Sequence, residues 1–230
     1  MHRHEVTIPM NLEADGAERI PKALSNDELR LLERLAHAHN GMGAGTRLAR
    51  DATLSRILAP SGTMDRIAAS RLGDDAQPVR AIIFDKQPGA NWSLGWHQDR
   101  TIAVRRRMEA PGFGPWSRKS GMDHVEPPFE YIEGMITLRA HLDVCGSDNA
   151  PLMIVPGSHR LGRIPVKDVE GVVSQRETVA CLADAGDIWV YASAILHASN
   201  AAESPKHRRV LHVDYSRARL PHGLEWLGVR

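Results

Sequence analysis

The stretch EGMITLRAHLD, residues 133–143, alternates between apolar and polar side chains from its fourth residue onward. The apolar positions are Ile136, Leu138, Ala140 and Leu142, and the polar positions are Thr137, Arg139, His141 and Asp143. A period of two is typical of a β-strand whose two faces have different surroundings. We expect the apolar face to pack under helices. The polar face then either looks into the interior of a barrel or meets solvent.

Similar short segments flank this stretch and are separated by Gly, Pro and Asn. The expected strands are 79–85, 96–104, 133–143, 152–155, 187–191 and 208–215. Such a series predicts an antiparallel sandwich or barrel rather than alternating strands and helices. The fold class is therefore mainly β.

The N-terminal third has a helical pattern instead. Ser25-Asn26-Asp27-Glu28 has the spacing of a capping box, and apolar residues follow it at helical intervals as far as Ala36. A second helix is expected around 61–72. We therefore expect one domain over 1–230, with a mostly helical part at 1–75 and a β core at 79–217 that contains an insertion at 105–130.

The composition narrows the function classes. The formal net charge of +1 gives no basic surface of the kind that nucleic acids or membranes attract. The N-terminus lacks the apolar segment of a signal peptide, so we expect a cytoplasmic protein. Cys145 and Cys181 are isolated in the sequence, which favours buried free thiols over a disulfide or a zinc site.

His97 and Asp99 are two residues apart, so on an extended strand both side chains would leave the same face. His197, on a distant strand, is a suitable third ligand. Two imidazoles and one carboxylate on one side of a metal leave the other positions open, which is the arrangement of non-haem Fe(II) oxygenases. These three residues are the candidate metal site.

Two further His-x-Asp pairs compete with this one, since the chain has 12 histidines. The pair at His212 has only His222 after it. The pair at His141 is the stronger alternative, because His159 or His197 could complete it. The surroundings of His97, a β-rich segment followed by a Gly/Asn/Pro turn, favour the first pair.

The motifs resemble the phytanoyl-CoA dioxygenase-like branch of the Fe(II)/2-oxoglutarate oxygenases. The resemblance runs from about Arg80 to Tyr215. It is carried by WHQD at 96–99, NAPLMIVPGSHR at 149–160, AGDIWVY at 185–191, HAS at 197–199 and the strand that begins at Arg208. The resemblance implies a double-stranded β-helix, or jelly roll, with the N-terminal helices packed against one sheet.

The resemblance also implies roles for individual residues. His97, Asp99 and His197 would bind iron, and Arg208 and Ser199 would bind the distal carboxylate of 2-oxoglutarate, for which a guanidinium group is a bidentate partner. Further hypotheses concern side chains near the cosubstrate and the substrate. Thr137 and Lys86 would help to bind 2-oxoglutarate, and Arg139, His141, Trp96 and Arg105 would contact the substrate.

The implied reaction uses Fe(II), 2-oxoglutarate and O2, with ascorbate as a reductant in vitro, and releases succinate and CO2 while a C–H bond is hydroxylated. Asp99 favours hydroxylation over halogenation, because halogenating relatives have a small residue at this position. We expect a small organic substrate, more plausibly a polar or carboxylate-bearing metabolite than a bulky thioester. The alternative is a metal-binding β-barrel that is non-catalytic or has a different activity.

Overall fold

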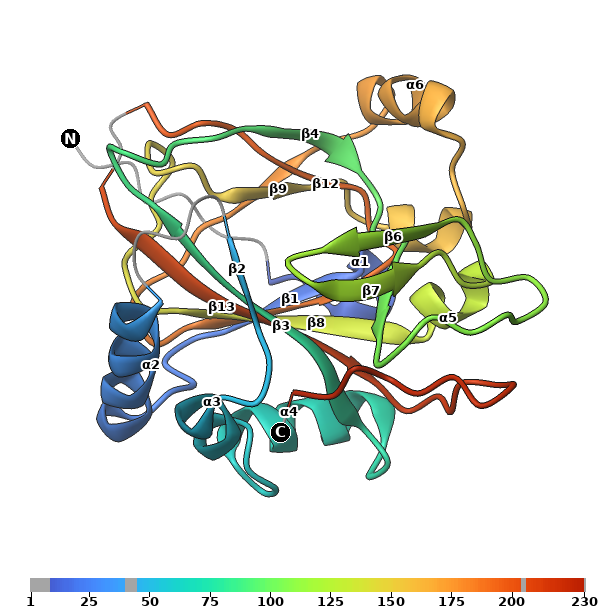
Figure 1. The fold of residues 1–230 in the computed structure, drawn as a ribbon. Coiled ribbons are helices and arrows are strands. Elements are labelled where there is room, and N and C mark those ends of the chain that lie inside the picture. Colours follow the sequence, from blue (N-terminus) through green and yellow to red (C-terminus); the bar gives the residue numbers. More distant parts are fainter. Residues whose placement is uncertain (1–8, 40–44, 204–205, 230) are drawn as a thin grey trace.

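The computed structural model describes residues 9–39, 45–203 and 206–229. Within these residues the largest sheet has six antiparallel strands in the order β1-β11-β8-β13-β3-β2 (Figure 1). Its strands are β1 Ala17–Ile20, β2 Thr46–Leu48, β3 Gln77–Lys86, β8 Met135–His141, β11 Ile188–Ala192 and β13 Arg208–Ser216. β13 lies at the centre between β8 and β3.

A second sheet has four strands in the order β10-β9-β12-β4. They are β4 Leu94–His97, β9 Leu152–Ile154, β10 Val179–Cys181 and β12 His197–Ser199. In Figure 1 this sheet is the upper layer, above the large sheet. The two antiparallel sheets form the jelly roll expected from the sequence.

The strand expected over 96–104 is divided in the structure. β4 ends at His97 and pairs with β12, whereas the next strand, β5 (Ile102–Val104), pairs with β7 in a third sheet. The chain thus crosses from one sheet to another between these strands. Asp99 consequently lies in the connecting segment and not on a continuous strand.

The insertion at 105–130 contains most of the third sheet, whose order is β5-β7-β6. β6 (Trp116–Lys119) and β7 (Met122–Val125) form a hairpin, and the short helix α5 (Phe129–Glu133) follows it. In Figure 1 the hairpin lies between the two main sheets at one end of the molecule.

Three N-terminal helices, α2 Asn26–Ala38, α3 Ala52–Ile57 and α4 Thr63–Leu72, cover the outer face of the large sheet (Figure 1). The short helix α1 Leu12–Asp15 directly precedes β1 and does not lie with them. The later helical segments are α6 Val169–Ser174 and 3₁₀ turns at Ser158–Leu161 and Val166–Asp168. The expected capping box is present at α2, where Ser25 and Glu28 cap each other's backbone N–H groups. The helix expected around 61–72 is α4.

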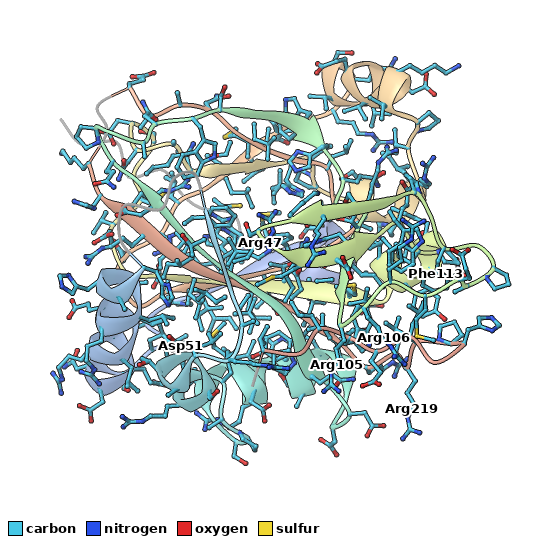
Figure 2. The ribbon with its side chains drawn as sticks, in the orientation of Figure 1. Arg47, Asp51, Arg105, Arg106, Phe113 and Arg219 are labelled. Atoms are coloured by element: carbon cyan, nitrogen blue, oxygen red, sulfur yellow. The ribbon has the colours of Figure 1, made fainter. Side chains whose placement is uncertain are left out.

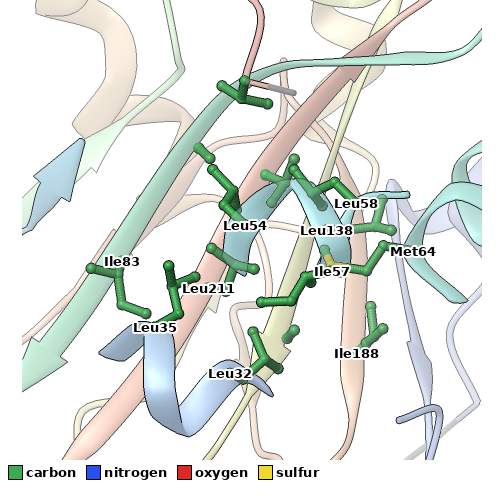
Figure 3. Close-up of a cluster of buried hydrophobic side chains, with 14 of the residues drawn as sticks. Leu32, Leu35, Leu54, Ile57, Leu58, Met64, Ile83, Leu138, Ile188 and Leu211 are labelled. Atoms are coloured by element: carbon green, nitrogen blue, oxygen red, sulfur yellow. The ribbon is translucent and has the colours of Figure 1, made fainter. Parts of the chain in front are cut away.

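The main apolar core fills the space between these helices and the sheet. Figure 3 shows Leu32 and Leu35 of α2 facing Leu138 and Leu211 of the strands. Burial of one such side chain contributes ~1.5–3 kcal/mol. The apolar face of the stretch 133–143 therefore packs under helices, as expected.

The polar face of the same stretch points into the interior, not to solvent. Thr137, Arg139 and His141 are 0%, 6% and 3% exposed. The expected alternation does not extend to Asp143, because β8 ends at His141. The Asp143 carboxylate instead makes a two-pronged ion pair with Arg209.

Both cysteines are free and buried, as the sequence predicted. None of the helices in the described parts of the chain is long and apolar enough to cross a membrane.

Candidate metal centre and cavity

Two histidines face each other across neighbouring strands of the small sheet. His97 ends β4 and His197 begins β12, and the two are direct partners in the antiparallel register. Their ring centroids are 4.2 Å apart. The Nδ1 atom of His97 lies 2.7 Å from the carbonyl oxygen of Gly95, and that of His197 lies 3.0 Å from the carbonyl oxygen of Ile195. Since a carbonyl only accepts, each Nδ1 donates and each Nε2 keeps a lone pair for a metal.

Asp99 completes the group. One ligand atom from each of His97, Asp99 and His197 lies within 4.8 Å of the other two. In the described part of the chain, no other group of three or more His, Cys, Asp or Glu residues has this geometry. The His141 pair therefore does not form a second cluster of this kind.

The electrostatics of the three residues suit a divalent cation. Burial and the neighbouring His97 lower the pKa of His197 to about 4, so its ring is neutral near pH 7. Burial acts to raise the pKa of Asp99, but the Arg80 guanidinium outweighs it and lowers the pKa below its usual value. Two neutral imidazoles and one carboxylate are the ligand set that Fe(II) accepts in non-haem oxygenases. The residues present thus fit this metal.

Gln98 holds the backbone between the two neighbouring ligands. Its side chain is 2% exposed, and its Nε2 donates to the carbonyl oxygens of Gly162 and Ala194 at 2.9 and 2.7 Å. Its Oε1 accepts from the N–H of Ile164 at 2.9 Å. These three bonds anchor the segment that leads from β4 to Asp99. The sequence analysis overlooked this role, because the partners of Gln98 are backbone groups more than 60 residues away in the sequence.

A second set of residues lies behind Asp99. Arg80 contacts the Asp99 carboxylate at 3.5 Å and forms a close ion pair with Asp214, its register partner on β13. Asp214 is fully buried and also accepts from Thr137 Oγ1 at 2.8 Å. His212 Nε2 lies 3.0 Å from Asp214. Arg80 thus links the candidate metal ligand to the carboxylate of the His212 pair, which the sequence analysis considered only as a competing metal ligand.

A cavity of about 640 Å³ lies beside the metal ligands, within the range of small-molecule sites. His97, Asp99 and His197 line it, together with Arg139, Ser199 and Arg208 from the predicted set. Trp92 also lines the cavity. Three of the side chains predicted to bind the cosubstrate or the substrate therefore line this cavity.

Three buried cations lie at the inner end of the cavity, where Arg139 and Arg208 line the wall and Lys86 lies behind the lining residue Ser199. Lys86, Arg208 and Arg139 are 0%, 2% and 6% exposed. Within the described residues none of them pairs with a carboxylate. The Nε atoms of both arginines are buried without a hydrogen-bond partner. Because unpaired buried charges are costly, this cluster is suited to an anion.

The hydrogen bonds that Lys86 and Arg208 make at the inner end of the cavity do not use all of the nearby hydrogen-bond donors. Lys86 Nζ donates to Ser199 Oγ at 2.9 Å and to the carbonyl oxygen of Asn200, and Arg208 donates to the carbonyl oxygen of Ala150. Since Ser199 Oγ accepts from Lys86, its own hydrogen is available. Burial, followed by the charges of Arg208 and Arg139, lowers the pKa of Lys86 to about 7.

Five of the predicted residues, Lys86 among them, are not part of the cavity wall. Thr137 is bonded to Asp214, and His141 is buried with its Nδ1 unpartnered. Trp96 packs against an apolar cluster that includes Leu196. Arg105, labelled in Figure 2, is exposed and forms an ion pair with Glu225 of the C-terminal segment.

A family model described as "Phytanoyl-CoA dioxygenase (PhyH)" matches residues 13–210. No curated protein matches the sequence. Solved structures share the fold at low identity. The epimerase SnoN of nogalamycin biosynthesis, in complex with Fe3+, alpha ketoglutarate and nogalamycin RO, has a TM-score of 0.65 and 18% identity, over 92% of this chain and 88% of that one.

Two further structures are similar to the same extent. The alpha ketoglutarate-dependent carbocyclase SnoK of nogalamycin biosynthesis has a TM-score of 0.64 and 19% identity, over 89% of this chain and 80% of that chain. EctD from S. alaskensis, with 2-oxoglutarate and 5-hydroxyectoine, has a TM-score of 0.66 and 16% identity, over 95% of this chain and 77% of that chain.

Proposed function

The chain belongs to the phytanoyl-CoA dioxygenase family, and from this premise we propose that it is an Fe(II)- and 2-oxoglutarate-dependent oxygenase that hydroxylates a small organic substrate. The observation that carries the proposal is a juxtaposition in one cavity. The ligand set His97, Asp99 and His197 shares that cavity with the buried arginines Arg139 and Arg208, whose Nε atoms have no partner, and Lys86 lies behind the lining residue Ser199. 2-Oxoglutarate needs both, because it chelates the metal through one end and carries a second carboxylate, which requires a cationic partner, at the other.

Each group of residues has a separate task in this proposal. His97, Asp99 and His197 hold Fe(II) through two Nε2 atoms and a carboxylate. Arg208 and Lys86 bind the distal carboxylate of 2-oxoglutarate by charge-assisted hydrogen bonds, worth ~1.5–3 kcal/mol each. The Ser199 hydroxyl adds a neutral donor.

Bound Fe(II) and 2-oxoglutarate supply the oxidising chemistry, in which O2 is consumed, 2-oxoglutarate becomes succinate and CO2, and a C–H bond becomes C–OH. The chain itself positions the substrate and excludes water from the cavity. No side chain has to transfer a proton. Asp99 would supply a carboxylate ligand where halogenating relatives have a small residue, which favours hydroxylation over halogenation.

The proposal is tested by succinate formation from 2-oxoglutarate under air, with Fe(II) and ascorbate and a panel of candidate substrates. We expect His97→Ala to abolish succinate formation. His37→Ala, which removes an exposed histidine from α2, is the matched control and is expected to retain it. Mass spectrometry of the product distinguishes hydroxylation from epimerisation or ring closure. Absence of both succinate and metal-dependent 2-oxoglutarate binding in the wild type would leave the alternative, a metal-binding barrel of another function.

A further inference from the structure

Two more basic side chains line the cavity on its open side. Arg47 extends from β2 and is partly exposed, and Lys119 extends from β6 and is exposed. This contrasts with the inner end, where Lys86 and Arg208 are buried. Figure 2 labels Arg47 between β2 and the β6–β7 hairpin. We call Arg47 and Lys119 the mouth pair.

The mouth pair has no acidic partner among the residues that the structure describes. In the described parts of the chain neither residue forms an ion pair with a carboxylate, and Nε of Arg47 is buried without a hydrogen-bond partner. The nearby Arg80 is already engaged with Asp214 and Asp99. The donors of the mouth pair are therefore available to a ligand.

The cations on this side are close enough to repel one another. Burial and then the charge of Arg80 lower the pKa of Arg47. Burial and then the charges of Arg47 and Arg80 lower the pKa of Lys119. An anion between them would remove this repulsion and satisfy the unpaired Nε of Arg47.

The backbone is shaped to bring β2 to the cavity. A Cβ atom at Gly45, just before β2, would lie 2.7 Å from the ring of Phe84 on β3. The absence of a side chain at this position allows the close approach. The Phe84 ring also lies 5.6 Å from the guanidinium carbon of Arg139. Phe84 therefore forms an apolar surface that reaches from the mouth to the inner cations.

We infer that Arg47 and Lys119 bind an acidic group of the substrate, a carboxylate or a phosphate, at the mouth of the cavity. This inference rests on the proposed function, because it assigns the substrate class of the same site. The cavity then holds an anion at each end. The distal carboxylate of 2-oxoglutarate binds at the inner end, the acidic group of the substrate binds at the mouth, and the carbon skeleton of the substrate packs on Phe84.

The test uses protein loaded with Mn(II) and saturated with 2-oxoglutarate. Butyrate, its neutral isostere butyramide, and inorganic phosphate are the probes, and the paramagnetic relaxation of their ¹H or ³¹P signals reports binding near the metal. We expect relaxation of butyrate, phosphate or both, and none of butyramide. Stronger binding of one anion identifies the acidic group as a carboxylate or a phosphoryl group.

The variants are Arg47→Gln, Lys119→Gln and the double substitution. Loss of a charge-assisted hydrogen bond predicts anion binding weaker by ~10-fold or more for each. Arg118→Gln is the matched control, because Arg118 neighbours Lys119 on the same strand but contacts Gly121 and Asp123 outside the cavity. We expect it to bind the anions as the wild type does. Lys119 is exposed, so its variant remains informative if Arg47→Gln fails to fold.

Two failures can be told apart by calorimetry of 2-oxoglutarate. If the wild type does not bind 2-oxoglutarate in the presence of Mn(II), the proposed function fails and this inference fails with it. If 2-oxoglutarate binds normally but butyramide is relaxed as strongly as butyrate, the inference alone is refuted. It is likewise refuted if the mouth-pair variants bind the anions as tightly as Arg118→Gln does.

Discussion

Lys86 and Arg208 are direct partners in the register of β3 and β13, so two cations lie side by side in the protein interior. Such a pair opposes folding of the unliganded chain, since neither charge has a carboxylate partner among the described residues. An anion bound between Lys86 and Arg208 would offset this cost. The predictions for this end of the cavity follow from that cost and from its relief by 2-oxoglutarate.

Arg208→Lys keeps the charge but removes the planar guanidinium fork. We expect the protein to fold and 2-oxoglutarate to bind ~10–100-fold more weakly, because a bidentate charge-assisted contact becomes a single one. Calorimetry in the presence of Mn(II) measures this change. Arg209→Lys is the matched control, since Arg209 on the same strand pairs with Asp143 outside the cavity. An equal loss of affinity in both variants would argue against a specific role for Arg208.

Asp214→Asn removes the charge that faces Arg80. We expect a loss of stability of ~3–5 kcal/mol, because the buried Arg80 guanidinium loses its close carboxylate partner and keeps only the longer contact with Asp99. We also expect metal affinity to fall ~10–100-fold, because Asp214 no longer fixes Arg80 in the position from which it contacts Asp99. Urea unfolding and a Mn(II) titration measure the two effects.

Thr137→Val is the control for this prediction. It removes one hydrogen bond to Asp214 but leaves the ion pair with Arg80. We expect it to cost ~1 kcal/mol and to leave metal affinity unchanged. If both variants retain wild-type metal affinity, the network behind Asp99 has a structural role only.

Gln98→Leu tests the anchor between the two neighbouring ligands. The substitution leaves the carbonyls of Gly162 and Ala194 and the N–H of Ile164 without their partner, at ~1–3 kcal/mol for each group that stays dry. We expect a lower unfolding free energy together with weaker Mn(II) binding. Gln98→Glu keeps the acceptor for Ile164 but places a buried carboxylate oxygen against the two carbonyl oxygens, so we expect its loss of stability to be no milder. Unchanged metal affinity in a folded Gln98→Leu protein would contradict the anchoring role.

The fold was predictable where the signal is local. The alternation in residues 136–141 and the capping box at Ser25 depend on neighbours in sequence, and both are present in the structure. The motif resemblance selected His97, Asp99 and His197, which the structure brings together. In each case a short pattern carries the geometry, so one sequence was sufficient.

Other parts of the site depend on contacts between distant segments. Arg47 and Lys119 lie on strands of three and four residues, too short for a clear period. Arg80 and Asp214 meet only through the register of β3 and β13. The continuous strand expected through Asp99 failed for the same reason, because the chain changes sheets after His97. Sequence patterns do not specify such pairings between sheets.

The pKa of Lys86 gives the last prediction, a dependence on pH with opposite signs for stability and for binding. Burial and the two neighbouring arginines lower this pKa from 10.5 to about 7 in the folded protein. Between these two values the unfolded chain holds more protons at this residue, so its contribution to stability rises with pH. An anion prefers the charged ammonium group, so the affinity for 2-oxoglutarate should fall as pH rises above about 7. Melting temperatures and calorimetry from pH 6 to 9, about one unit below to about two units above that pKa, measure both trends. In Lys86→Met we expect both trends to be weaker than in Lys167→Met, which removes an exposed lysine. If the two variants have the same pH profiles, Lys86 does not titrate in this range and its role at the inner end of the cavity must be revised.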